Sequence, residues 1–497
     1  MPPAPTKPAV LIPMPQGVGV NGVVSWALRL AGALAERQWP VGLVLHPEPD
    51  GHAPAGHQIP QNVRVFDLRS KPAMRTPGLS LSPYVRAYRD ALNEMGWSNR
   101  TPAIVLPNLE AESFAIAAAL SATHGDHLRI LGWQHSDIAF DAALLATYEP
   151  MLAAMVGVSG HIAAALRERL PWRAGDVHAI PYGVEVVGTL PPRAPGPLRL
   201  LYAGRLEHEQ KRVGVLLRLA SVLEERNVSH EIRFVGDGPA AGEVQNHLAS
   251  RPSATRLPPA DRAQMREHLR WADAMLLASR YEGLSIAMLE AMAAGVVPIV
   301  TRVRSGAAEA VESGVNGLLL DANGEDDAVA RQFADAIEQL SMDDLARLRT
   351  AAHARATERY SLATHADACE RLFLDTIRNA PRWWPLDRAC TFTESPTTSV
   401  PPDAPQRAAE AIANIEGPIA IYGAGRHTLA IAGVLATANV ACVIDDDPKN
   451  HGTTLWGWPI VGIEDAPKTS VLVSSYMHAD AMAARCEAAG LRPIRLY

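Results

Sequence analysis

The strongest constraint on the fold is an alternation between two kinds of segment that runs along most of the chain. Short apolar or β-branched runs bounded by Gly, Pro or Asp, such as residues 9–15, 41–46 and 103–107, alternate with longer stretches of helical periodicity. Parallel strands need a long crossover connection, which is usually a helix. The sequence therefore predicts an α/β protein with parallel sheets.

Two proline-rich breaks divide this pattern into units. The first is LPPRAPGP at 190–197, and the second is the Pro-, Ser- and Thr-rich stretch at 381–405, which shows no sustained period. Such compositions are typical of extended linkers. Two consecutive doubly wound domains would leave a cleft at the carboxyl ends of their strands, where ligands bind. The predicted parts are an N-terminal domain at 9–189, a second domain at 197–378, a linker at 379–405 and a small unit at 406–497.

Composition excludes several classes of protein. Lys and Arg total 46 against 53 Asp and Glu, and a net charge of −7 argues against a sequence-independent nucleic-acid binder. The four cysteines are far apart and lack zinc-ligand spacing, so we expect no metal and a reducing, cytoplasmic setting. The apolar stretch at 291–300 is about half the roughly 20 residues of a membrane-spanning helix. Peripheral contact with the inner face of a membrane stays open.

The densest motif is SRYEGLSIAMLEAMAAGVVPIVT at 279–301. It reads as a strand end, a turn containing Glu282, and an amphipathic helix that begins near Leu284 and contains Glu290. Backbone N–H groups at a helix N-terminus are a natural site for a phosphate. Carboxylates on either side could accept hydrogen bonds from sugar hydroxyls. The candidate phosphate-binding amides are those of Gly283, Leu284 and Ser285.

The stretch from Glu282 to Glu290 resembles the E-x7-E signature of the retaining family-4 glycosyltransferases of GT-B fold. By itself, a pair of glutamates at this spacing would be weak evidence for the family, but the sequence around them also matches the family's signature. The resemblance implies two Rossmann-like domains facing a cleft, an acceptor-side domain at 9–189 and a nucleotide-sugar donor domain at 197–378. It also implies that Glu282 contacts donor-sugar hydroxyls, that Glu290 contacts the nucleotide ribose, and that the intervening backbone holds phosphate.

A second element, LLYAGRLEHEQKRVGVLLRLA, places Arg205 and Lys211 after a strand and ahead of a helix. The two cations could face a pyrophosphate, with about 1.5–3 kcal/mol from each charge-assisted hydrogen bond. The simpler alternative is that both cations are solvated and form ion pairs with Glu207 and Glu209. The AGRL…K pattern is similar to the family's phosphate-binding loop, which favours the catalytic interpretation.

A third element, FVGDGP, is a strand followed by a turn with Gly236 and Gly238. By itself such a sequence is only a turn, but it matches a family segment near the nucleotide. The three elements keep the family's order and spacing over 198–323.

In the first domain the resemblance is weaker. Gly17 and Gly19 follow the first strand, where related enzymes bring a glycine loop close to the donor phosphates, although a turn capped by Asn21 is an equal alternative. His135 ends a later strand and could lie by the reacting carbon, or it is an ordinary loop histidine. The family's Pro-Asn-Gly-Val appears here with Tyr182 in place of the asparagine.

The final unit contains IYGAGRHTLAIAG, which has Gly423 and Gly425 but Thr428 at the third glycine position of G-x-G-x-x-G. Asp445 ends the next strand about 20 residues on, where an acidic residue could hold a ribose hydroxyl. The segment resembles small nucleotide-binding Rossmann-like units attached to sugar-modifying enzymes. A structural appendage without a ligand is the alternative.

Together these features predict a glycosyltransferase of the hexosyltransferase class, needing no cofactor or metal and acting in polysaccharide biosynthesis. The donor would be a UDP- or GDP-linked sugar and the acceptor a saccharide, a lipid-linked glycan or a small molecule. Alternatives are a nucleotide-sugar epimerase or hydrolase, a nucleotide-sugar-binding scaffold with a degenerate transferase body, and an NAD-dependent oxidoreductase. The expected catalytic residues are Arg205, Lys211, Glu282 and His135.

Overall fold

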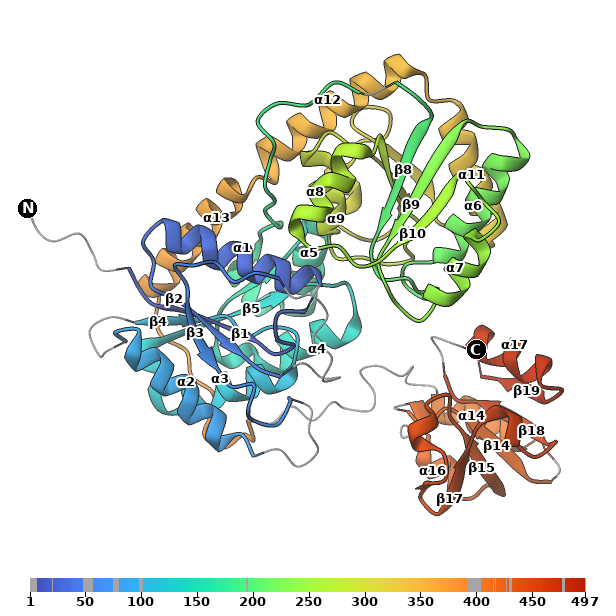
Figure 1. Ribbon diagram of the computed structural model, residues 1–497. Coiled ribbons are helices and arrows are strands. Elements are labelled where there is room, and N and C mark those ends of the chain that lie inside the picture. The colour runs from blue at the N-terminus through green and yellow to red at the C-terminus, as the bar shows by residue number, and fades with distance from the viewer. Residues whose placement is uncertain are drawn as a thin grey trace, which may run out of the picture. The chain divides into compact units, whose positions relative to one another are not determined.

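The structure is a computed structural model that falls into two compact units, Met1–Phe392 and Thr393–Tyr497 (Figure 1). The larger unit holds two α/β domains, and the smaller unit holds a third sheet. The described residues are 7–19, 21–47, 57–74, 80–97, 102–193, 195–390, 404–413, 415, 417–425, 427–428, 431–475 and 479–496.

The first domain is built on a parallel sheet that has seven strands within the described residues. Its central strands are buried on both faces, which explains why they read as continuous apolar runs rather than alternating ones. In spatial order the strands are β3 (Arg64–Asp67), β2 (Val41–Leu45), β1 (Val10–Met14), β4 (Ala103–Val105), β5 (Leu128–Gln134), β6 (Leu152–Gly157) and β7 (Val177–Ala179).

Helices connect these strands, and two of them begin at side chains suited to capping. Asn21 caps the first helix by accepting from Val24 N at 2.9 Å, and Ser159 caps the fifth by accepting from Ile162 N at 3.2 Å. The helices of this domain are α1 (Gly22–Glu36), α2 (Ser82–Glu94), α3 (Ala111–His124), α4 (Ala139–Tyr148) and α5 (Gly160–Arg169), with 3-10 turns at Gly125–His127, Glu149–Met151 and Pro171–Asp176.

The second domain repeats this architecture with a parallel sheet that has six strands in the part of the chain described. Sequential strands run outward from the centre to one edge and then to the other, which is the doubly wound order. In spatial order they are β10 (Ala254–Leu257), β9 (His230–Val235), β8 (Leu198–Ala203), β11 (Ala274–Leu277), β12 (Val297–Arg302) and β13 (Leu318–Asp321). The helices are α6 (Val213–Glu225), α7 (Ala241–Leu248), α8 (Arg262–Trp271), α9 (Ile286–Ala293), α10 (Ala307–Ala310), α11 (Asp326–Glu338), α12 (Met342–Arg359) and α13 (Leu362–Arg378).

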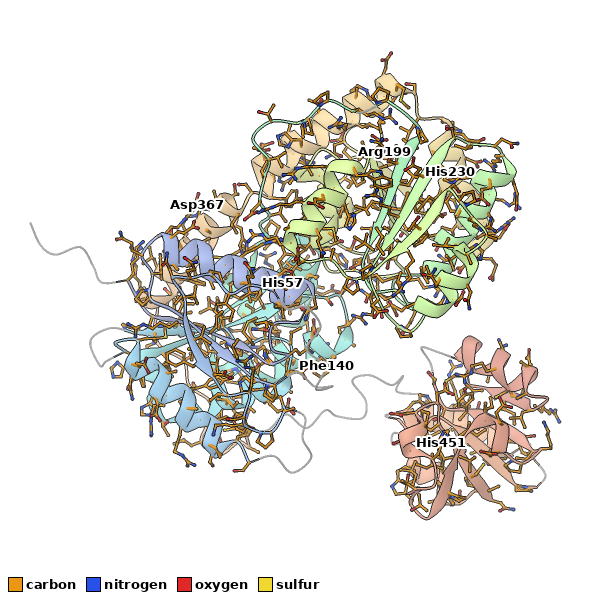
Figure 2. All side chains as sticks on the ribbon, in the orientation of Figure 1. His57, Phe140, Arg199, His230, Asp367 and His451 are labelled. Atoms are coloured by element: carbon orange, nitrogen blue, oxygen red, sulfur yellow. The ribbon has the colours of Figure 1, made fainter. Side chains whose placement is uncertain are left out.

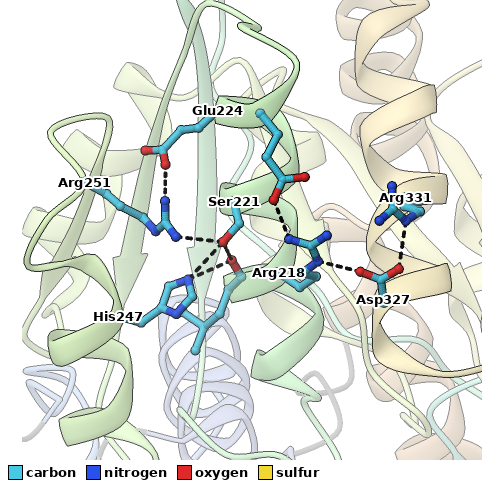
Figure 3. A network of polar contacts seen from close by, with 9 residues as sticks. Arg218, Ser221, Glu224, His247, Arg251, Asp327 and Arg331 are labelled. Atoms are coloured by element: carbon cyan, nitrogen blue, oxygen red, sulfur yellow. Dashed lines mark hydrogen bonds and ion pairs between the residues drawn. The ribbon is translucent and has the colours of Figure 1, made fainter.

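A polar network ties α6 to its neighbours on the outer face of this domain (Figure 3). The Arg218 Nε donates to Asp327 Oδ1 on α11 at 2.5 Å, and Arg331 Nε donates to the other carboxylate oxygen at 2.7 Å. On the side of α7, Arg251 Nη2 donates to Ser221 Oγ at 2.9 Å. Exposed ion pairs of this kind each contribute little stability. The network therefore aligns the helices, while the buried apolar core supplies most of the stability.

The last helix of the second domain, α13, returns to the first domain and packs against α1 (Figure 1). Arg37 Nη1 donates to Asp367 Oδ1 at 2.6 Å, and the indole of Trp26 donates to His365 Nε2 at 3.1 Å. The other nitrogen of His365 donates to Pro181 O at 2.7 Å. Helix α13 of the second domain therefore holds both α1 and the Pro181 segment of the first domain in place.

The segment that follows α13 packs onto the first domain. Trp384 is 4% exposed, its ring lies 5.1 Å from that of Tyr148, and its backbone N–H donates to Ser121 Oγ at 3.0 Å. The ring of Trp383 lies against Gly125, where an added Cβ would come within 2.2 Å of it.

The smaller unit has a sheet with one antiparallel edge pair, and the other described strands are parallel. The predicted fold class, two doubly wound domains followed by a small Rossmann-like unit, is confirmed. In spatial order its strands are β16 (Thr454–Leu455), β17 (Trp458–Val461), β15 (Val440–Ile444), β14 (Ile419–Tyr422), β18 (Ser470–Val473) and β19 (Arg492–Arg495). Its helices include α14 (Ala404–Ala413), α16 (Ala432–Leu435) and α17 (Ala479–Ala488), with 3-10 turns at Pro448–Asn450 and Ile463–Asp465.

Candidate functional site

The turn between β11 and α9 carries the densest sequence motif. The helix begins at Ile286 rather than near Leu284, because the Ser285 hydroxyl accepts a hydrogen bond from Met288 N at 3.3 Å and makes Ser285 the N-cap. Glu290 is therefore the fifth residue of the helix. The predicted amides of 283–285 lie in the turn that enters this N-terminus.

The carboxylate of Glu282 lies in this turn and is held by two donors. Ser279 Oγ donates to Glu282 Oε1 at 2.7 Å, and the Lys211 ammonium forms an ion pair with the same oxygen. Only 12% of the Glu282 side chain and 17% of the Lys211 side chain are exposed. Glu207 instead shapes the loop, because its carboxylate accepts from the backbone N–H of Lys211 at 2.9 Å. The structure thus joins two of the predicted catalytic residues, from segments 71 positions apart.

The GDG turn packs directly on the loop that contains Arg205. Gly236 and Gly238 have φ values of 148° and 154°, which favour glycine. A Cβ at Gly236 would lie 2.0 Å from Gly204 O, and a Cβ at Gly238 would lie 2.4 Å from Leu206 O. The two glycines are therefore needed for the close approach of these loops.

Arg205 itself is exposed, and its guanidinium makes no ion pair within the described part of the chain. Its backbone is fixed, since the buried Tyr202 hydroxyl donates to Arg205 O at 2.6 Å. The side chain is free to contact a ligand from a rigid loop. Arg205 and Lys211 thus follow the same strand but differ in environment.

The glycine loop of the first domain joins β1 to α1. Gly17 has a φ of 65° and its N–H donates to Met14 O at 3.1 Å. Val18 O accepts from His57 N at 3.0 Å, and Gly19 is half-buried in the same loop. The turn is capped by Asn21, as one of the two alternatives predicts.

Helix α1 lies across α9 of the other domain and brings Arg29 to Glu290, with which it forms an ion pair. His57, labelled in Figure 2, lies beside the same helix. Its Nε2 is 3.0 Å from the Oγ of Ser25, four residues before Arg29 on the same helix face. Burial and the charge of Arg29 lower the pKa of His57, and the same two causes lower the pKa of Arg262. Glu290 therefore lies close to the cationic side chains of Arg29 and Arg262, which the sequence motif does not predict.

His135 directly follows β5 and is 6% exposed. Its Nδ1 lies 2.8 Å from Tyr182 Oη, and the two rings stack at 6.0 Å. Burial lowers the pKa of His135 to about 3, so the imidazole is neutral at physiological pH. Its carbonyl touches the α9 turn of the second domain, where a Cβ on Gly283 would lie 2.0 Å from His135 O. His135 and the Glu282 turn are thus brought together where the two domains meet.

Asp141, on α4, carries no sequence motif but lies beside this contact. Its Oδ2 accepts from Ser136 N at 3.1 Å, directly after His135. Burial raises the pKa of Asp141 to about 7, against an opposing effect of the backbone hydrogen bonds from Ser136 and His135. The sequence did not predict a role for Asp141 or Arg29, because neither residue belongs to a recognisable motif.

We expect Asp141→Asn to raise the melting temperature relative to the wild type above about pH 7. The unfolded chain loses the Asp141 proton near the ordinary pKa of 3.8, whereas the folded chain keeps it to about 7, so wild-type stability falls as the pH rises through this window. Asparagine stays neutral throughout. Scanning calorimetry from about pH 4 to 8 should show an advantage that shrinks toward acid; a constant difference would contradict the prediction.

In the smaller unit the structure brings the two parts of the partial fingerprint together. Gly423 has a φ of 109°, Gly425 lies in the same loop, and Asp445 directly follows the neighbouring strand β15. The Asp445 carboxylate accepts from Ala424 N at 3.3 Å and from Asp447 N at 2.8 Å. It therefore stabilises the loops around it.

The described residues offer neither a cluster of metal ligands nor a membrane-spanning helix. No group of three or more His, Cys, Asp or Glu residues there could hold a metal ion. No helix among them is long and apolar enough to cross a membrane.

Comparison with known proteins identifies the second domain. Residues 197–343 match the family model described as Glycosyl transferases group 1. The D-inositol 3-phosphate glycosyltransferase of Pseudarthrobacter chlorophenolicus is 30% identical over 161 residues, which are 31% of this chain and 37% of that protein. The chain thus spans little more than a third of this curated relative.

Solved structures match over about three quarters of the chain. Sucrose-phosphate synthase from Thermosynechococcus elongatus superposes with a TM-score of 0.60 and 19% identity, covering 75% of this chain and 99% of that one. Anabaena HepE in complex with UDP gives a TM-score of 0.55 and 16% identity, covering 74% of this chain and 100% of that one. The fold is GT-B, as the sequence predicts.

Proposed function

We propose that the protein is a glycosyltransferase that moves a sugar from a nucleoside-diphosphate-sugar to a hydroxyl acceptor, with retention and without a metal. The observation that carries the proposal is the contact of Glu282 with Lys211 at the N-terminal turn of α9. That turn lies against His135 of the other domain. The glycosyl transferases group 1 domain at 197–343 supports the same activity.

The roles follow from the charges. Lys211, Arg205 and the amides of 283–285 would hold the diphosphate and stabilise the charge that develops as it leaves, which is usually the largest catalytic contribution. Glu282 would accept hydrogen bonds from donor-sugar hydroxyls and Glu290 from the ribose. A UDP-linked donor is supported by Anabaena HepE, which was solved with UDP; a GDP-linked donor is the alternative.

Binding of a ribose at Glu290 has a structural requirement. The Glu290 carboxylate is engaged by Arg29 of the first domain. That ion pair involves Oε1, so a ribose hydroxyl would bind either at Oε2 or in place of Arg29 at Oε1. In the second case, nucleotide binding would be coupled to a change at this domain contact.

The proposal is tested by thermal stabilisation of the full chain with UDP, GDP, ADP, CMP and NAD. A ligand at about 100 times its dissociation constant adds about 2.7 kcal/mol to stability. We expect stabilisation by one nucleoside diphosphate, and we expect Glu290→Ala to abolish it because the ribose loses its acceptor.

The matched control is Glu338→Ala, which removes an exposed, arginine-paired glutamate of the same domain and should leave the stabilisation intact. Stabilisation by NAD alone, unaffected by Glu290→Ala, would contradict the proposal. It would move the function to the smaller unit, where β14, the strand that Gly423 follows, pairs with β15 and β18 at the point where the strand order reverses.

A further inference from the structure

The two ring nitrogens of His135 have different surroundings. Nδ1 lies 2.8 Å from Tyr182 Oη. Nε2 is buried and has no hydrogen-bond partner among the described residues. Buried polar atoms are nearly always paired, and an unpaired one at a domain contact needs an explanation.

A neutral imidazole carries one proton, so two arrangements are possible. If Tyr182 donates to Nδ1, both of those groups are satisfied and only the Nε2–H is left without a partner. If Nδ1–H donates to the tyrosine oxygen, the tyrosine proton has no acceptor and Nε2 has no donor. The first arrangement leaves one buried group unpaired and the second leaves two, so the first is favoured.

Tyr182 is held in place on both sides by α13. Pro181 O accepts from His365 Nδ1 at 2.7 Å, and a Cβ on Gly183 would lie 2.5 Å from His365 Cβ. Tyr182 itself is 4% exposed, and burial raises its pKa well above the ordinary value, so the hydroxyl keeps its proton. The rings of Tyr182 and His135 are nearly parallel, with an interplanar angle of 8°.

We propose that Tyr182 is a positioning residue that donates to His135 Nδ1 and thereby presents Nε2–H as a fixed donor to an oxygen of the sugar. This inference rests on the proposed function. The Nε2–H can donate to a hydroxyl or carbonyl oxygen but cannot remove a proton. His135 then orients the sugar next to the Glu282 turn and is not a general base.

The test removes only the hydroxyl, with Tyr182→Phe. Long-range proton–nitrogen NMR of the full chain labelled with 15N-histidine should show His135 as the Nε2–H tautomer, assigned by its loss in His135→Gln. In Tyr182→Phe we expect the signal to move toward the other tautomer or a mixture. We expect kcat at saturating donor to fall about tenfold, the equivalent of one hydrogen bond. The dissociation constants for UDP and GDP, measured by calorimetry, should not change.

The control is Tyr84→Phe, which removes the hydroxyl of another buried tyrosine of the same domain, one that donates to Pro72 O at 2.7 Å. It should change neither the His135 tautomer nor kcat. An Nδ1–H tautomer in the wild type, or a Tyr182→Phe protein with unchanged tautomer and kcat, overturns the inference. A wild type that transfers sugar from no donor overturns the proposed function, while the NMR spectrum still decides whether Tyr182 sets the tautomer.

Discussion

Lys211→Ala should lower turnover at saturating donor by at least tenfold. The Lys211 ammonium is the mostly buried cation of the loop that we propose binds phosphate, and a charge-assisted hydrogen bond contributes about 1.5–3 kcal/mol, which corresponds to roughly 10- to 150-fold in rate. The effect should fall on kcat, because the negative charge on the diphosphate grows as the sugar leaves. Steady-state kinetics with the donor that the nucleotide panel identifies would measure it.

The control for this variant addresses stability, because Lys211 also neutralises Glu282. Removing one member of a mostly buried ion pair leaves the other charge uncompensated, and that alone destabilises a fold. The double variant Lys211→Ala with Glu282→Gln should recover the melting temperature but not the turnover. Unchanged turnover in Lys211→Ala would remove the residue from catalysis and leave it a structural partner of Glu282.

The fold was largely predictable from the sequence because the relevant signals are local. Short apolar runs of the kind at Val10–Met14 are typical of strands buried on both faces of a sheet, and the polar side chain of Asn21 marks where a helix can begin. The start of α9 was misplaced by two residues, since its N-cap is set by one hydroxyl whose hydrogen bond is visible only in three dimensions. The GDG turn was placed next to the nucleotide by resemblance, but only the structure shows which backbone its glycines approach.

The site was less predictable because its contacts cross the chain. The Arg29 to Glu290 pair joins positions 261 apart, and the His135 to Tyr182 bond joins positions 47 apart. Spacing along a helix or strand says which residues share a face, not which face of another domain they meet. Tyr182 was noticed as a departure from a family pattern, yet its partner could not be named. The buried carboxyl of Asp141 gave no signal at all, because burial rather than sequence perturbs its titration.

Gly283→Ala should reduce turnover about 100-fold, since a misplacement of roughly 1 Å at a reacting centre can cost that much. The added Cβ would lie 2.0 Å from His135 O, a backbone atom at the end of a buried strand that cannot rotate away. The α9 turn and the end of β5 must therefore move apart, which separates Glu282 from His135. Steady-state kinetics and the melting temperature would be measured together. Overpacking costs about 1–3 kcal/mol, so the variant should still fold, with a lower melting temperature.

Gly242→Ala is the matched control, because a Cβ there meets nothing within 4 Å and the residue lies in helix α7 of the same domain. It should leave turnover unchanged. If Gly283→Ala kept wild-type turnover, the contact between the α9 turn and His135 would not persist during the reaction, and catalysis would take place with the two domains further apart. His135 would then lie too far from the Glu282 turn to orient the donor sugar, which would have to be held by the second domain alone.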